Sequence, residues 1–312
     1  MSDSHATALP PCTPADVGAV RISVIIPTYR RKRHLLAVLD QLAQQSILPE
    51  EVLVIDSSPA DERLFGSELE PYAPWLKYEI ATADAGNVSR KRNDALRRST
   101  GDVVVFLDDD VQFDTHMLAD YVDALVHHTA DVVGGVILLP GESPRSAPRA
   151  RPPLLIDDPG APNLQAYDGV RPSYVVCTAS LCARREALVA IGGFDEQLSR
   201  LEDVELGLRL ERAGYRVIHH NTPVVHHLVA SASGARSADR GIEWMLPSLF
   251  YFQYRHFPAR RRSWLLASTV WQFCRPSRHW LTPALIVRRA RGIVAAHREA
   301  AERVAAGPRL MR

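Results

Sequence analysis

The chain has 312 residues, of which 46% are hydrophobic and 23% charged, and its formal net charge is +1. This composition is that of an ordinary folded protein, long enough for one large domain or for a domain with an appendage. No stretch reaches the roughly 20 apolar residues of a membrane-spanning helix. Cys177 and Cys182, the nearest pair among four cysteines, lack the spacing of a zinc or redox motif. We therefore expect reduced thiols and a cytoplasmic protein.

The two ends of the chain differ in charge from the rest. Residues 1–20 contain no apolar run, so we expect a flexible N-terminus rather than a signal peptide. From Arg255 onward the chain has 13 arginines, no lysine and two acids, and this basic part includes the apolar segment 263–274. Two interpretations stay open: a basic helix that lies on an anionic membrane, or aromatic residues that pack on the main domain. Nothing else in the chain supports nucleic-acid binding.

Strands and helices alternate along the first part of the chain. Apolar, β-branched runs predict strands over 21–27, 51–56, 76–81, 102–110 and 130–140, and turn-forming serines follow the second of them. Helices are predicted over 31–46, 87–99 and 115–128. This order predicts an α/β fold with a mainly parallel sheet that is flanked by helices on both faces. In such sheets, ligands bind outside the carboxyl ends of the strands.

The next part of the chain is less regular. Residues 140–172 are rich in proline and glycine and too long for a simple connector, so we expect a mobile loop over a site. Residues 173–188 predict a strand followed by a helix. A glycine turn, an acidic loop and an amphipathic helix over about 204–213 come next, followed by a return strand and by a short strand that carries two histidines.

Three consecutive carboxylates, Asp108, Asp109 and Asp110, follow the apolar strand VVVFL. They are compatible with a solvated loop or with a helix N-cap, where aspartate is favoured. The uniformly apolar strand before them instead indicates that they emerge from the centre of a sheet. A divalent cation, Mg²⁺ or Mn²⁺, would offset their repulsion, since these ions bind carboxylates together with phosphate oxygens.

Two further groups of polar residues are candidates for the same site. Glu202, Asp203 and Glu205 lie where a loop enters a helix, so that one acid can cap the helix while another acts as a general base. The alternative is that all of them only cap the helix. His226 or His227, after a short strand, offers a neutral imidazole to the metal, although exposed histidine pairs often have no such role.

The order of these motifs resembles the family 2 glycosyltransferases with the GT-A fold. The resemblance covers roughly residues 21–229, about two thirds of the chain. It implies inverting transfer of a sugar from a nucleotide-diphospho-sugar to an acceptor hydroxyl, with a Rossmann-like nucleotide-binding half. The motifs that carry it are ISVIIPTYRR, VLVIDSS, GNVSRKRND, GDVVVFLDDDV, GGFDE, LEDVELGLRLERAGYRV and the following histidine.

The resemblance also implies roles for single residues. Asp203 matches the position of the general base, with Glu202 as its neighbour and substitute. Asp110 and Asp108 match the metal-binding acids, and His226 matches the metal-proximal histidine better than His227 does. Residues that match the donor-binding positions are Pro27, Thr28, Tyr29, Asp56, Asn87, Arg92, Asn93, Asp108 and Asp109. Among these, Asp56 is expected to read the base.

The expected domains follow from the same resemblance. A flexible N-terminus (1–20) precedes a catalytic domain (21–230), whose nucleotide-binding half spans about 21–110 and whose acceptor-binding half spans about 111–230. A basic helical extension (231–312) follows. The implied partners are a nucleotide-diphospho-sugar and a glycan or lipid-linked acceptor of cell-surface glycan assembly, and the implied location is the cytoplasm or the inner face of the cell membrane.

The sequence departs from the family pattern at one point, and three other functions are alternatives to the glycosyltransferase. The family often has an Asn-Arg pair after the first strand, whereas here Tyr29 is followed by RRKRH. A sugar nucleotidyltransferase has a similar sheet but needs a glycine-rich phosphate loop, and PTYRRKRH contains no glycine. A metal-dependent phosphohydrolase also uses acids and histidines. A non-enzymatic nucleotide-sugar sensor would lack one of the acids, and none is missing.

Overall fold

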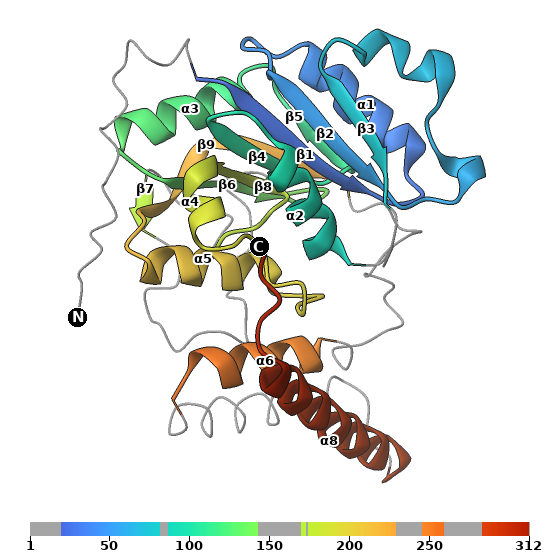
Figure 1. The fold of residues 1–312 in the computed structure, drawn as a ribbon, viewed down its shortest axis with the longest axis vertical. Coiled ribbons are helices and arrows are strands. Elements are labelled where there is room, and N and C mark those ends of the chain that lie inside the picture. The colour runs from blue at the N-terminus through green and yellow to red at the C-terminus, as the bar shows by residue number, and fades with distance from the viewer. Residues whose placement is uncertain are drawn as a thin grey trace.

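The computed structural model describes residues 20–81, 87–142, 170–172, 174–228, 245–258 and 283–311. One sheet of nine strands, with helices on both faces, forms the centre of the described part (Figure 1). The strands are β1 (Ile22–Thr28), β2 (Glu51–Asp56), β3 (Leu76–Ile80), β4 (Val103–Leu107), β5 (Val111–Phe113), β6 (Val132–Leu138), β7 (Val170–Pro172), β8 (Ser180–Arg184) and β9 (Val217–His227). The helices are α1 (Lys32–Ala43), α2 (Val88–Arg98), α3 (Met117–His127), α4 (Arg185–Ala190), α5 (Glu202–Arg212), α6 (Leu246–His256) and α8 (Pro283–Ala306).

The sheet has a parallel half and a mixed half. Its strand order is β3-β2-β1-β4-β8-β6-β9-β5, and β7 also pairs with β9. The first four strands are parallel, and Ile25 of β1 lies between Leu53 of β2 and Phe106 of β4. Beyond them, β8 runs antiparallel to β4 and β6, whereas β6 and β9 are parallel. The predicted α/β fold with flanking helices is confirmed, and its parallel part is the half that the βαβ order predicts.

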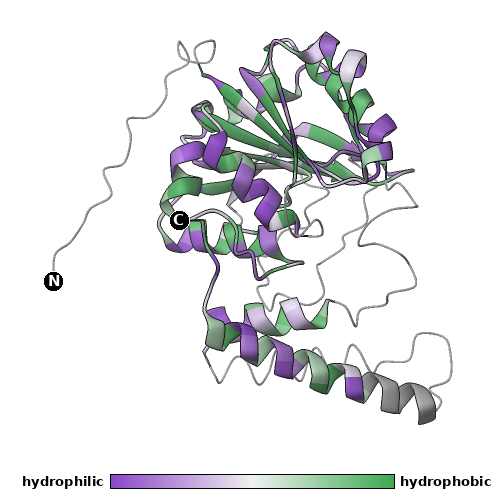
Figure 2. Ribbon diagram, turned by 45° about the vertical axis from the view of Figure 1, so that its right-hand side comes forward, coloured by the Kyte–Doolittle hydropathy of each residue, from purple (hydrophilic) through white to green (hydrophobic). Residues whose placement is uncertain are grey.

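Both faces of the sheet are buried, which explains why its central strands are uniformly apolar. Ile22, Val24 and Ile26 of β1 point to the face that α1 and α3 cover. Ile25, between them, points to the opposite face and packs with side chains of α2, α4 and α5. Figure 2 shows this pattern as hydrophobic strands beneath helices whose outer sides are hydrophilic.

A third apolar cluster joins the C-terminal helices to the sheet domain. Val204 and Leu208 of α5 pack in it with Phe252 of α6 and with Ala296 and Ala300 of α8. Within the described ranges, no helix has both the length and the apolar character that crossing a bilayer requires. The predictions for residues 1–19, for most of the 140–172 loop and for the segment 263–274 lie outside the described residues.

Three strands differ from the sequence prediction, and one of them is β7, which lies at the end of the segment 140–172 that was expected to be a loop. The return strand and the short strand before the histidines are one element, the 11-residue β9. The three-residue β5 follows the aspartates directly and was not predicted, because three residues are too few to show a strand pattern. β5 pairs antiparallel with the end of β9, with Val111 opposite His227. This pairing brings the aspartates and the histidines together.

Candidate functional site

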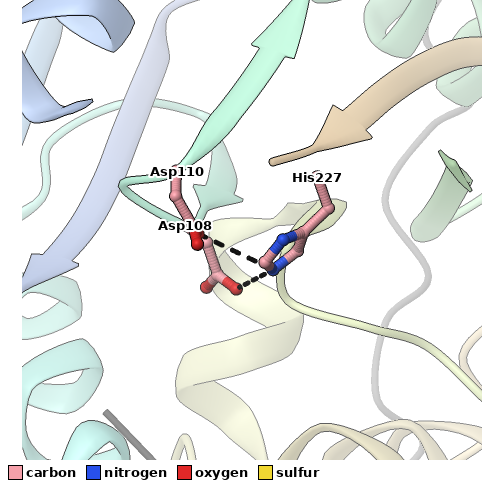
Figure 3. A group of neighbouring side chains, drawn as sticks. All are labelled: Asp108, Asp110 and His227. Carbon is pink, nitrogen blue, oxygen red and sulfur yellow. Dashed lines mark ion pairs between the residues drawn. The ribbon is translucent and has the colours of Figure 1, made fainter. Parts of the chain in front are cut away.

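Asp108, Asp110 and His227 form a cluster in which two carboxylates and an imidazole face one another (Figure 3). The turn from β4 to β5 carries the aspartates, and the backbone N–H of Leu228 donates to the carbonyl oxygen of Asp110 at 2.8 Å. His227 Nε2 lies 3.4 Å from Asp108 Oδ2 and 3.7 Å from Asp110 Oδ1. One ligand atom from each residue lies within 4.8 Å of the other two, which fits a single bound cation.

The structure corrects the choice between the two histidines. We expected His226 at the metal, but the structure places His227 beside Asp108 and Asp110. Successive side chains of a strand point to opposite faces, so the two histidines cannot both face the cluster. His227 is buried, whereas His226 is exposed opposite the exposed Gln112. The register between β9 and the three-residue β5 decides which histidine faces the aspartates, and no local sequence pattern records it.

Asp109, the middle aspartate, has different partners. Its carboxylate accepts a hydrogen bond from Thr28 Oγ1 at 2.6 Å and forms an ion pair with Arg31 Nη1 at 2.8 Å. The same Arg31 nitrogen lies 2.9 Å from Asp110 Oδ2. Burial raises the pKa of Asp109, and the charge of Arg31 and the hydrogen bond from Thr28 oppose that rise. Arg31 was not predicted as a site residue. It lies in the RRKRH segment after Tyr29, where the sequence departs from the pattern of the family.

Arg92 of α2 connects the aspartate turn to the beginning of α5. Its Nη2 lies 3.3 Å from Asp108 Oδ1, and its Nη1 lies 3.0 Å from Glu202 Oε1. The guanidinium carbon is 5.6 Å from the centroid of the Phe194 ring, so the ring supports the cation from one side. The Arg92 side chain is only 4% exposed. A buried guanidinium between two acids fixes the distance between the two parts of the site.

Asp203 lies in the first turn of α5, beside the buried Glu202. Asp203 Oδ1 accepts a hydrogen bond from the backbone N–H of Val204 at 2.8 Å. Burial, together with the neighbouring charge of Glu202, raises the pKa of Asp203 to about 7. A general base works best when its pKa is close to the pH of the reaction, so the environment of Asp203 suits it for proton abstraction near neutral pH.

The residues at the carboxyl ends of β1 and β2 lie next to one another. The sheet register pairs Pro27 with Ile55 and Thr28 with Asp56. The buried Asp56 carboxylate accepts hydrogen bonds from the Ser58 backbone N–H at 2.6 Å and from the Tyr78 hydroxyl.

Two neighbours of these strand ends differ in their exposure. Tyr29 is 38% exposed, and the Arg30 guanidinium lies 5.4 Å from its ring centroid. The buried Lys91, which was not predicted, donates from Nζ to the carbonyl oxygen of Thr28 at 3.1 Å. Burial lowers the pKa of Lys91 to about 8.

Asn87 and Asn93, expected at the donor, hold the chain together in this structure. Asn87 Oδ1 caps α2 by accepting from the Arg90 backbone N–H at 3.0 Å, and its Nδ2 donates to the carbonyl oxygen of Glu196 at 2.8 Å. Asn93 is fully buried. It exchanges two hydrogen bonds with the backbone of Phe194 and donates a third to Glu196 Oε1 at 3.1 Å. Both side chains therefore position the loop before α5.

Two carboxylates and an imidazole are ligands that Mn²⁺ and Mg²⁺ accept, and both ions leave coordination positions for phosphate oxygens. The donor set of Asp108, Asp110 and His227 therefore fits a divalent cation with an open side. Asp203 and Glu202 lie across Arg92 from this cluster. The site thus combines a cation-binding part with a carboxylate that can remove a proton.

Comparisons with known proteins show what the chain is similar to. The chain is 27% identical over 230 residues to the O-antigen biosynthesis protein RfbC of Myxococcus xanthus, which covers 69% of this chain and 18% of the relative. It is also 28% identical over 135 residues to the poly(ribitol-phosphate) beta-N-acetylglucosaminyltransferase TarS of Staphylococcus aureus, over 42% of this chain and 23% of the relative. The chain thus spans about a fifth of the length of these two relatives.

Solved structures share the fold. S. aureus TarS 1–349 in complex with UDP-GlcNAc superposes with a TM-score of 0.58 at 17% identity, over 92% of each chain. The mannosyltransferase PcManGT of Pyrobaculum calidifontis, solved with GDP-Man and Mn²⁺, gives 0.55 at 21% identity, over 92% of this chain and 79% of that chain. Residues 23–190, more than half of the chain, match the family profile described as "Glycosyl transferase family 2". The chain therefore belongs to glycosyl transferase family 2, as its motifs predicted.

Proposed function

We propose that this protein transfers a sugar from a nucleotide-diphospho-sugar to an acceptor hydroxyl, with the help of a divalent cation and with inversion at the anomeric carbon. One observation carries the proposal. Asp108, Asp110 and His227 meet at the end of the sheet, and Arg92 ties this cluster to the acidic turn of Glu202 and Asp203. An inverting transferase has to neutralise charge on the leaving diphosphate and to remove the proton of the acceptor hydroxyl. A cation site and a base on opposite sides of one arginine match these two tasks.

In the proposed reaction Asp203 removes the proton from the acceptor hydroxyl. The acceptor oxygen then bonds to the anomeric carbon while the bond from that carbon to the diphosphate oxygen breaks, and nucleoside diphosphate leaves. Asp108, Asp110 and His227 would hold the cation, which when bound neutralises charge on the leaving diphosphate. Arg92 keeps the two halves of the site in register through its ion pairs.

The donor is proposed to lie over the ends of β1 and β2. Pro27, Thr28 and Tyr29 lie there beside Asp56, which remains the candidate for reading the base. The structures that share the fold include one with UDP-GlcNAc and one with GDP-Man, so both nucleotides are candidates. Tyr29, the most exposed of these residues, offers an aromatic face for stacking.

The relatives support a role for the proposed reaction in cell-surface glycan assembly, since they are named for O-antigen and poly(ribitol-phosphate) synthesis. We propose a glycan or lipid-linked acceptor and a location in the cytoplasm or at the inner face of the membrane. The division into a catalytic domain (21–230) and a basic extension (231–312) belongs to the same proposal. The extension would approach the membrane through its arginines.

A thermal-shift panel tests the donor and the cation together. UDP-, GDP- and dTDP-sugars are added with and without Mn²⁺, because a ligand that binds only the folded state raises the melting temperature. We expect one nucleotide class to raise the melting temperature, and to raise it more with Mn²⁺. Release of free nucleotide is then followed with and without candidate acceptors. Release that an acceptor does not accelerate, with phosphate as the product, would instead indicate a phosphohydrolase.

A further inference from the structure

The loop that leads into α5 is held by segments from the far end of the chain. We call residues 192–201 the α5 loop and residues 307–311 the tail. The Met311 backbone N–H donates to the carbonyl oxygen of Gly192 at 2.7 Å, and the Glu196 N–H donates to that of Arg309 at 2.9 Å. The tail thus pairs with the α5 loop, and in Figure 1 it returns from α8 toward α5.

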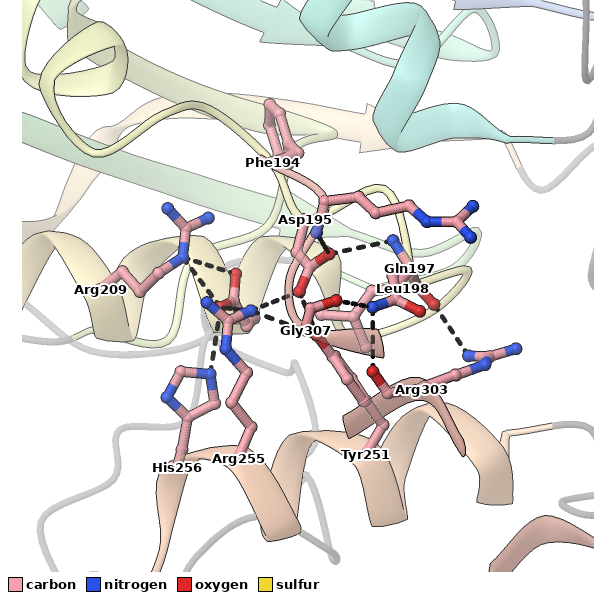
Figure 4. Close-up of polar contacts among 12 residues, drawn as sticks. Phe194, Asp195, Gln197, Leu198, Arg209, Tyr251, Arg255, His256, Arg303 and Gly307 are labelled. Atoms are coloured by element: carbon pink, nitrogen blue, oxygen red, sulfur yellow. Dashed lines mark hydrogen bonds and ion pairs between the residues drawn. The ribbon is translucent and has the colours of Figure 1, made fainter. Parts of the chain in front are cut away.

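Asp195, in the middle of the α5 loop, has both carboxylate oxygens engaged although it is fully buried. Its Oδ1 accepts from the backbone N–H groups of Gln197 and Arg309, each at 3.0 Å. Its Oδ2 accepts from the Tyr251 hydroxyl at 2.5 Å and forms an ion pair with Arg255. Tyr251 and Arg255 both belong to α6, so α6 and the tail hold this side chain together (Figure 4).

Glu205, in the first turn of α5, is the second fully buried acid of this group. Arg209 Nε contacts both of its oxygens, at 2.8 and 2.9 Å. Glu205 Oε1 also lies 3.0 Å from His256 Nε2 and 3.2 Å from Arg255 Nη1. Arg255 Nη1 therefore bridges the two buried acids. We call Asp195, Glu205, Tyr251, Arg255 and His256 the α5 clamp.

The α5 clamp brackets the proposed base. Asp195 precedes Asp203 on the α5 loop, and Glu205 follows it by two positions on the same helix. Between them Leu201 has a φ of +62°, in the left-handed region that a bulky residue rarely occupies. Such a conformation is strained and persists only where the surroundings enforce it. The side chain of Leu201 is only partly buried, so packing of this residue alone does not account for it.

We infer that the α5 clamp positions Asp203 for catalysis, and this inference rests on the proposed function. Buried ion pairs add little net stability compared with apolar residues of the same size, so stability alone does not explain two buried acids around one arginine. The clamp instead fixes the loop on both sides of the strained Leu201, and so fixes where the first turn of α5 presents Asp203. Tyr251 and Arg255 act as positioning residues, remote from the reacting atoms.

The test uses the nucleotide-sugar that gives the largest thermal shift, with Mn²⁺, and water as the acceptor. Asp203 would take a proton from water as it does from a hydroxyl, so nucleoside diphosphate release reports its function. Arg255→Met is expected to lower kcat about 100-fold, the loss that a displacement of about 1 Å can cause. KM for the donor and its Kd by calorimetry are expected to stay unchanged. Arg255→Lys is expected to recover much of kcat, because one ammonium can pair with both acids.

Two tyrosine variants test the same positioning role with a smaller change to the protein. Tyr251→Phe removes the hydroxyl that binds Asp195 but keeps the ring, and we expect a folded protein with lower kcat and unchanged donor Kd. Tyr254→Phe is its matched control, since Tyr254 lies on the same helix and its hydroxyl contacts His297 of α8 instead. The control is expected to keep the kcat of the wild type.

The outcomes separate the inference from the proposed function. A wild-type protein that releases no nucleoside diphosphate from any donor overturns the proposed function, and the inference with it. If the wild type is active but Tyr251→Phe keeps its full kcat, or loses kcat no more than Tyr254→Phe does, the positioning role is refuted. That comparison decides the question also where Arg255→Met fails to fold.

Discussion

The raised pKa of Asp203 makes the pH dependence of the reaction a direct test of its role. A general base acts as the carboxylate, and burial and Glu202 raise the pKa of Asp203 to about 7. About one tenth of the Asp203 side chains are then ionised at pH 6 and about nine tenths at pH 8. We expect kcat/KM for donor hydrolysis to rise about ninefold over this interval and to level off above it, because kcat/KM reports groups of the free enzyme.

Asp203→Asn removes the base without changing the size of the side chain. We expect the rate to fall by about 10²- to 10⁴-fold, the usual contribution of a general base, and the remaining activity to lose its dependence on pH between 6 and 8. Nucleotide binding, measured by calorimetry, is expected to be unchanged. Glu211→Gln is the matched control, because it makes the same kind of change at the exposed end of α5.

The raised pKa of Asp203 also predicts whether Asp203→Asn stabilises or destabilises the fold. A carboxyl group whose folded-state pKa lies above its unfolded value destabilises the fold when it is ionised. For Asp203 this cost grows as the pH rises from about 4 to about 7 and is complete above that. The full shift corresponds to a few kcal/mol at most, and partial exposure of Asp203 reduces it. Asp203→Asn is thus expected to melt higher than wild type at pH 8, with a smaller difference at pH 5.

Two results would refute this reasoning. A wild-type kcat/KM that stays flat from pH 6 to pH 8 would show that no group with a pKa near 7 controls the reaction. An Asp203→Asn variant that binds nucleotide poorly but retains its turnover would assign Asp203 to donor binding instead. A loss of turnover in Glu211→Gln equal to that in Asp203→Asn would trace the effect to α5 as a whole.

Three further predictions concern the cation, the α5 loop and the basic extension. His227→Ala is expected to abolish the increase in nucleotide thermal shift that Mn²⁺ causes, whereas His226→Ala is expected to leave that increase intact. The reverse result would show that the cluster of Asp108, Asp110 and His227 does not bind the cation. Asn93→Ala is expected to cost about 1–3 kcal/mol in urea unfolding, because buried partners lose their hydrogen bonds; an unchanged midpoint contradicts this. Deletion from residue 260 onward is expected to reduce binding to anionic liposomes in co-sedimentation, and equal binding rejects the membrane proposal.

The parallel half of the sheet was predictable because local signals suffice for it. Strands such as β4 are uniformly apolar and are followed by polar turns, and the intervening helices show their own spacing. The position of Asp108 and Asp110 at the end of a buried strand was predictable for the same reason. The choice of His227 was not, because it depends on the register between β9 and the three-residue β5.

Interactions between segments that are distant along the chain could not be predicted from the sequence. The motif of Asn93 predicted a place at the donor, and the motif did not show that its hydrogen-bond partners lie on a loop about 100 positions later. Apart from the Gln197 N–H, the partners of Asp195 come from α6 and from the tail, more than 50 positions further on. No local spacing records such pairings, so the α5 clamp becomes visible only once the fold brings its parts together.

The three consecutive aspartates illustrate how the fold resolves a cluster of like charges. Cationic or imidazole groups face all three: Arg31, just before α1, pairs with Asp109 and Asp110, Arg92 of α2 pairs with Asp108, and His227 of β9 lies between Asp108 and Asp110. The carboxylate of Asp109 binds Thr28 and Arg31, and these two contacts anchor the turn. Because that turn is anchored, its outer two carboxylates are held facing the imidazole. The middle aspartate thus helps to build the candidate cation site without belonging to it.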